Sequence, residues 1–70
     1  MIESFEVVFK EYNAATLFEY DTKTFELCLT WYDITNGEKR IRKKTCEEKM
    51  SNDEFLKFKN KLKCYHQIIE

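Results

Sequence analysis

The chain has 70 residues and a formal net charge of −1, a length that predicts one domain, residues 1–70, near the lower limit of unaided folding. Hydrophobic residues make up 43% and aromatic residues 16%, which excludes a disordered chain although 36% of the residues are charged. No run of 18 apolar residues occurs, and the N-terminal residues lack the basic start and apolar centre of a signal peptide, so we expect a cytoplasmic protein without a membrane span.

Size and composition also lead to expectations about assembly and origin. A core this small contributes no more than about 3–5 kcal/mol, so we expect a homodimer that covers more apolar surface. Lys, Ile, Asn, Phe and Tyr are plentiful, whereas the chain has one Gly and no Pro. AT-rich codons encode the plentiful residues, so the composition favours a low-GC bacterium, or a phage or mobile element living in one.

The first half of the chain predicts extended structure, because apolar and polar side chains alternate with a period of two. Residues 5–9 form the first predicted strand. Residues 17–20 form a second, shorter strand that ends in a turn at 21–23. Residues 25–31 carry the strongest alternation, and we expect this strand in the middle of the sheet.

The next turn, at Asn36-Gly37, allows two registers for the strand that follows. A two-residue loop places three basic residues on the same face as Trp31, whereas a three-residue loop with a bulge moves them to the other face and puts Ile41 opposite Trp31. The three basic residues are Arg40, Arg42 and Lys44. Burying one Ile costs nothing comparable to burying three unpaired cations, so the sequence predicts the bulged, three-residue loop.

The C-terminal segment predicts a helix. Ser51 and Glu54 match a capping box, and five apolar residues follow at helical spacing on one narrow stripe. The stripe consists of Phe55, Phe58, Leu62, Tyr65 and Ile69. The predicted fold is therefore α+β, a four-stranded antiparallel meander sheet (β-β-β-β-α) with one C-terminal helix packed on one face.

No catalytic or metal-binding motif stands out. His66 is the only histidine and has neither a nucleophile nor an orienting carboxylate in a recognisable motif. Cys28, Cys46 and Cys64 are spaced eighteen residues apart, unlike the close pairs of zinc sites. We therefore expect no enzyme, no cofactor and no metal, with Cys28 and Cys46 as apolar fillers or reduced thiols.

Charge is divided unevenly along the chain. Residues 1–38 carry eight acidic and two basic side chains, whereas residues 39–70 carry ten basic and five acidic ones. Two interpretations remain open at this stage. The asymmetry marks a bipolar binding surface, or acidic strands pair with basic ones inside one sheet.

The most distinctive segment is the basic run at residues 39–44. In the bulged register its alternate cations share the open sheet face with nearby aromatic residues. The candidate partner-binding residues are Tyr20, Tyr32, Arg40, Arg42 and Lys44. This face suits a protein partner, or single-stranded nucleic acid held by charge and stacking. Alternatively, the run is an edge strand whose charges prevent aggregation.

The predicted order β-β-β-β-α resembles that of the PC4-type and Pur-type single-strand-binding domains. The resemblance is carried by the aromatic strand at 25–31 and the Ser-capped helix start at 51–55. The resemblance implies a dimer that binds single strands on its sheet. The chain departs from those domains because it is acidic overall. From the residues themselves we expect a small non-catalytic protein that docks on a larger protein as an inhibitor or regulator, with the nucleic-acid-binding dimer as the alternative.

Overall fold

A computed structural model describes residues 1–70 as one antiparallel sheet with one helix. The elements are β1 (Ile2–Phe9), the 3-10 turn η1 (Lys10–Tyr12), β2 (Ala14–Asp21), β3 (Glu26–Thr35), β4 (Glu38–Lys49), α1 (Asn52–Tyr65) and β5 (Gln67–Ile69). Across the sheet the strands run in the order β4-β3-β2-β1-β5. The α+β class, the four-stranded meander and the C-terminal helix are confirmed, and β5 is a fifth strand that the sequence analysis did not predict.

The core lies between α1 and one face of β1, β2 and β3. Alternation places the inward side chains of paired strands side by side, as in Phe5 opposite Phe18 and Tyr20 opposite Leu27. Phe5 stacks on Phe18 with ring centroids 4.8 Å apart, and Tyr20 stacks on Phe55 at 4.1 Å. The buried cluster consists of Phe5, Val7, Phe18, Tyr20, Leu27 and Phe55.

The helix begins as predicted and ends earlier. The Ser51 side chain accepts a hydrogen bond from the Glu54 amide, and the Glu54 carboxylate accepts one from the Ser51 amide. Phe55 is the only buried residue of α1, and Tyr65 is exposed. The helix ends at Tyr65, and Ile69 lies instead in β5, which pairs with β1. The prediction that Ile69 belongs to the helical stripe is therefore wrong. No helix in the chain has the length and apolarity needed to cross a bilayer.

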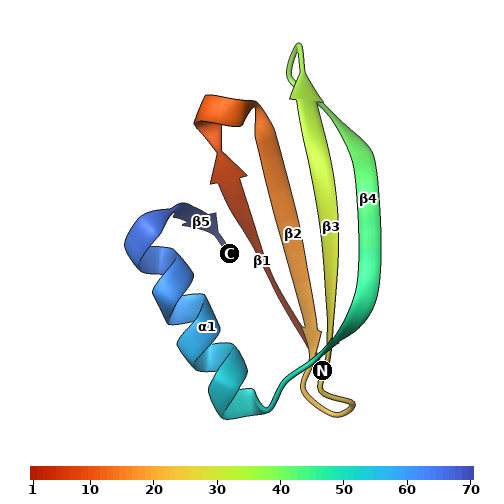
Figure 1. The fold of residues 1–70 in the computed structure, drawn as a ribbon, viewed down its shortest axis with the longest axis vertical. Helices are drawn as coiled ribbons and strands as arrows, with labels where there is room; N and C mark the ends of the chain where they lie inside the picture. The colour runs from red at the N-terminus through yellow and green to blue at the C-terminus, as the bar shows by residue number, and fades with distance from the viewer.

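The position of the helix leaves part of its own face of the sheet uncovered. Figure 1 shows α1 lying beside β1 and β5, while the upper parts of β3 and β4 stand away from it on the other side of the molecule. On the helix side of these two strands, Asp33 and Arg40 are exposed and Trp31 is half-buried. A side chain on that face of β4 therefore reaches water rather than the core.

The hairpin between β3 and β4 has a two-residue loop. Asn36 and Gly37 both have positive φ (53° and 80°), and Thr35 pairs directly with Glu38. This is the primed turn that matches the twist of paired strands. The predicted three-residue loop is therefore wrong. Its premise was that cations on the helix side would be buried, and α1 does not extend over β4, so that cost does not arise.

Two bulges follow in β4. Tyr32 pairs with Ile41 but Trp31 pairs with Lys43, so Arg42 is an extra residue. The second irregularity lies between Leu29 and Leu27, where β4 again has one residue more than β3. Bulges of this kind increase the local twist and interrupt the regular edge of a strand.

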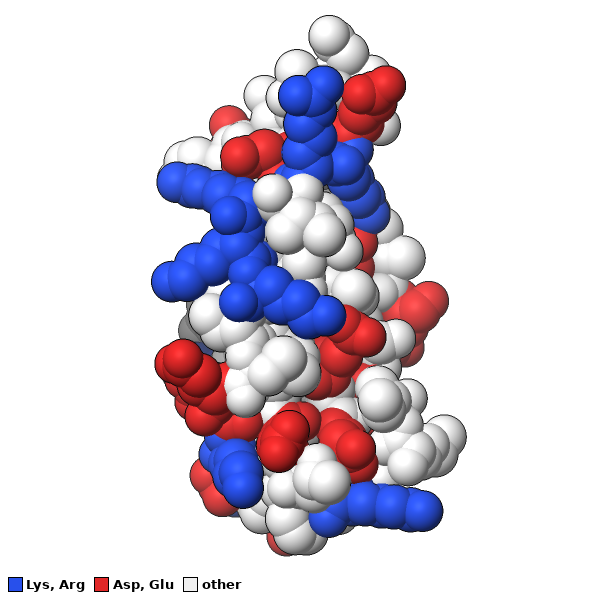
Figure 2. Space-filling view, turned by 90° about the vertical axis from the view of Figure 1, so that its right-hand side faces the viewer, with Lys and Arg blue, Asp and Glu red and all other residues white.

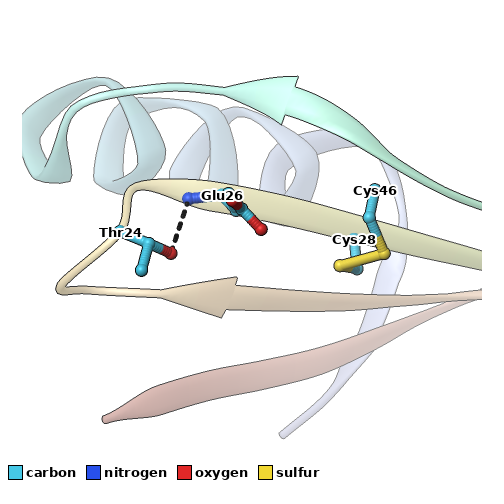
Figure 3. Close-up of a disulfide and its surroundings, with 4 residues drawn as sticks. All are labelled: Thr24, Glu26, Cys28 and Cys46. Atoms are coloured by element: carbon cyan, nitrogen blue, oxygen red, sulfur yellow. Dashed lines mark hydrogen bonds between the residues drawn. A yellow bond between two sulfur atoms is a disulfide. The ribbon is translucent and has the colours of Figure 1, made fainter.

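Two cysteines meet beside the second irregularity, in the register that the first bulge sets. Cys28 of β3 and Cys46 of β4 form a disulfide with their Cα atoms 4.0 Å apart (Figure 3). The prediction that both are fillers or reduced thiols is wrong, because their meeting depends on a cross-strand register that the sequence spacing does not reveal. Cys64 is an exposed free thiol.

Candidate functional site: the basic edge strand

The cations of β4 form one exposed group, which we name the basic strip. Its members are Lys39, Arg40, Arg42, Lys43 and Lys44, and all five are exposed. β4 is the edge strand of the sheet and pairs only with β3. Figure 2, viewed from the β4 side, shows basic side chains gathered over the upper half of this surface and acidic ones mostly below them.

The basic strip is divided between the two faces of the sheet. Lys39 and Lys44 pair with Ile34 and Thr30, on the face opposite the helix, which we name the outer face. On the helix side, Arg40 pairs with Asp33 and Lys43 pairs with Trp31. Arg42 is the bulge residue between these rows. The prediction that Arg40, Arg42 and Lys44 share one face is wrong, because it followed from the three-residue loop.

Three cations of the strip are free of acidic partners. Lys39 forms an ion pair with Glu6 at 2.6 Å. Arg40 lies 3.9 Å from Glu38 with both side chains exposed, a contact that contributes little. Arg42, Lys43 and Lys44 form no ion pair. The strip therefore presents positive charge that the rest of this net-negative chain leaves uncompensated.

The outer face is less open than the sequence suggests. The ion pair between Lys39 and Glu6 joins β4 to β1 on this face, and Ala15 and Thr30 on the same face are buried. Intramolecular contacts therefore close its centre. The free surface lies along the edge of the sheet rather than across its outer face.

Tyr20, a predicted partner-binding residue, is part of the core. Its side chain is 0% exposed, and its hydroxyl donates to the carbonyl oxygen of Met50 at 2.7 Å and lies 2.9 Å from the side-chain oxygen of Asn52. Burial, together with the nearby charge of Glu54, raises the pKa of the Tyr20 hydroxyl. The assignment of Tyr20 to the binding surface is therefore wrong, because its strand turns this row of side chains toward α1.

The aromatic residues near the strip do not form one stacking platform. Trp31 and Tyr32 are neighbours in β3 and point to opposite faces of the sheet, each half-buried. The ammonium group of Lys43 lies over the Trp31 ring at 5.7 Å, and that of Lys39 over Tyr32 at 5.8 Å. A nucleic-acid base stacking on either ring would have to displace a lysine.

A second feature lies where η1 meets the end of α1. A hollow of about 360 Å³ there is lined by Val8, Phe9, Lys10, Glu11, Tyr12, Tyr65, His66 and Gln67. His66 contacts Phe9 edge-to-face with ring centroids 4.9 Å apart. No group of three or more His, Cys, Asp or Glu residues is placed to hold a metal ion.

Lys39 and Lys43 belong to the strip although the sequence analysis did not select them. Both lie in the basic run at 39–44, which was the available signal. They were passed over because only one face of that strand was expected to be open. No protein-family model matches the chain, and comparison with curated proteins and with solved structures found no match.

Proposed function

We propose that this chain is a non-catalytic binding protein that docks on a larger protein through the basic strip and so acts as an inhibitor or regulator. The observation that carries the proposal is an edge strand, paired on one side only, with three uncompensated cations on a chain whose net charge is −1. Arginine is enriched among residues that dominate binding energy at protein interfaces, so Arg40 and Arg42 are the anchors we expect.

The arrangement of the strip supports a protein partner over nucleic acid. A single strand bound to a sheet needs cations and free ring faces on one surface. Here the cations occupy both faces, and lysines already cover Trp31 and Tyr32. A protein surface contacts the edge from both sides without that requirement.

The proposal is tested by affinity capture from a lysate of the source organism, with and without nuclease. We expect a partner that survives nuclease treatment and is lost when Arg42 and Lys44 are both changed to Glu. The control carries Lys57→Glu and Lys61→Glu, which reverse the same number of charges on the exposed side of α1. Equal capture by both variants would show that the strip is not the docking surface.

Nucleic-acid binding is the second candidate, since cations and aromatic rings are at least adjacent in β3 and β4. Electrophoretic shift of a labelled single-stranded oligonucleotide at low and moderate salt separates the two. A complex with a steep salt dependence that Arg42→Ala weakens would favour nucleic acid. No shift at micromolar protein would favour the protein partner.

Two further expectations stay predictions. The homodimer is one. The cytoplasmic location is the other, and the disulfide between Cys28 and Cys46 counts against it, because disulfides persist mainly in oxidising compartments.

A further inference from the structure

The free edge of β4 offers backbone groups as well as charge. β4 has twelve residues, the most of any strand, and pairs on one side only. Every second residue of an edge strand directs its N–H and C=O groups away from the sheet, where they can pair with another strand. None of the backbone hydrogen bonds outside the strand ladders and the helix uses a group of residues 38–49. The edge is therefore free to accept an added strand.

The division of the basic strip between two faces determines which kind of partner can contact all of it. A flat surface placed against either face meets only part of the strip, Lys39 and Lys44 or Arg40 and Lys43. A segment lying along the edge is flanked by both rows at once. We infer that the docking partner of the proposed function supplies an extended acidic segment, which adds to the free edge of β4 as a sixth strand.

Charge favours this occupant over a second copy of the chain aligned strip to strip. Like charges directly opposite one another across two strands are destabilising, so two basic strips aligned edge to edge repel. An acidic strand gains attraction along the same edge. Ile41, 67% exposed on the outer face between Lys39 and Lys44, adds one apolar contact. The matching segment thus has acidic side chains toward the helix side and an apolar one opposite Ile41.

The bulge at Arg42 sets the length of regular pairing. Residues 38–41 precede it without irregularity, and the ladder is interrupted after them. Four residues make a short added strand, whose continuation meets Arg42, Lys43 and Lys44 through side chains. We therefore expect backbone pairing near the Asn36-Gly37 hairpin and charge contacts beyond it.

The test uses three short, end-blocked, fluorescein-labelled peptides and fluorescence anisotropy. The first alternates Glu and Val, the second has the same sequence with alternate backbone amides N-methylated, and the third alternates Lys and Val. We expect the first to bind, the second to bind at least about tenfold more weakly because it cannot pair along the edge, and the third not to bind. Hydrogen exchange of the Lys39 and Ile41 amides, which point away from β3, should slow only with the first peptide.

Variants connect this binding to the strip. Arg40→Glu with Arg42→Glu should abolish binding of the Glu–Val peptide, and Lys57→Glu with Lys61→Glu should leave it unchanged. Equal affinity for the methylated and unmethylated peptides, or no binding of either, would overturn strand addition. If the captured partner still depends on the strip in that case, the proposed function stands and only its mode is wrong. Loss of that dependence would overturn the proposed function itself.

Discussion

At the scale of single residues, the Tyr20 side chain both packs in the core and holds the segment that connects β4 to α1. Its ring stacks on Phe55 at 4.1 Å, while its hydroxyl donates to the carbonyl of Met50, just before the helix. The hydrogen bond satisfies a polar group that would otherwise be buried alone. Tyr20 therefore positions the start of α1 on the sheet.

Tyr20→Phe should lower the free energy of unfolding by about 1–3 kcal/mol, because the Met50 carbonyl loses its partner. Urea denaturation measures the change. Tyr12→Phe is the matched control, since Tyr12 is 77% exposed. An equal loss in both variants would contradict the role given to the Tyr20 hydroxyl.

The same hydroxyl makes stability depend on alkaline pH. Burial, followed by the charges of Glu54, Glu3 and Asp21, raises the pKa of Tyr20 above its ordinary value of 10.0. The folded chain therefore keeps this proton more tightly than the unfolded chain, and the associated stability is complete below pH 10 and decreases above it. We expect the stability difference between wild type and Tyr20→Phe to narrow as the pH rises through that range. A constant difference would contradict this titration.

At the scale of elements, the helix shows where a correct local pattern stops applying. Phe55, Phe58 and Leu62 pack toward the sheet as their spacing predicts. Beyond Tyr65 the chain leaves the helix to pair with β1, and Glu70 forms ion pairs with Lys59 at 2.5 Å and Lys63 at 3.3 Å. Hydrogen bonds from these two lysines lower the pKa of Glu70, so its carboxylate stays charged and ties the tail to α1.

Phe55→Ala should cost roughly 3–5 kcal/mol, close to the whole stability of a domain this small, because the ring packs on both Phe5 and Tyr20. Tyr65→Ala is the control, since Tyr65 lies on the same predicted stripe but is 74% exposed. Thermal unfolding followed by circular dichroism should show a large loss for the first variant and little change for the second. Similar losses would mean that α1 contacts the sheet over its full length.

At the scale of the whole molecule, the disulfide links the edge strand to the sheet interior. Cys28 lies in β3 and Cys46 in β4, eighteen residues apart in sequence. Closing a loop of this length stabilises a fold by roughly 3 kcal/mol in the chain-entropy model. The bond is thus comparable with the contribution of the small core.

Reduction should therefore lower the melting temperature markedly, as should Cys28→Ser. Cys64→Ser should have no effect, because Cys64 is an exposed free thiol. Calorimetry with and without reductant measures the melting temperatures of the wild type and of both variants. A melting temperature that does not respond to reductant would contradict a stabilising role for the bond.

The sequence alone was sufficient for features that depend on neighbouring residues. Alternation identified β1, β2 and β3, the Ser51–Glu54 pair marked the start of the helix, and Asn36-Gly37 marked the hairpin. Each of these signals is local, because a period, a cap or a left-handed turn is set by the residues that form it. The basic run at 39–44 was likewise visible as the candidate surface.

Only the tertiary structure decided which segments meet and which surfaces stay open. The hairpin register depended on how far α1 reaches across the sheet. The burial of Tyr20 depended on which row of β2 side chains faces that helix. The disulfide, β5 and the division of the basic strip depended on two bulges and on pairing between distant strands. These features are set by the desolvation, packing and strand pairing of the whole molecule. They therefore cannot be predicted from residues that are close in sequence.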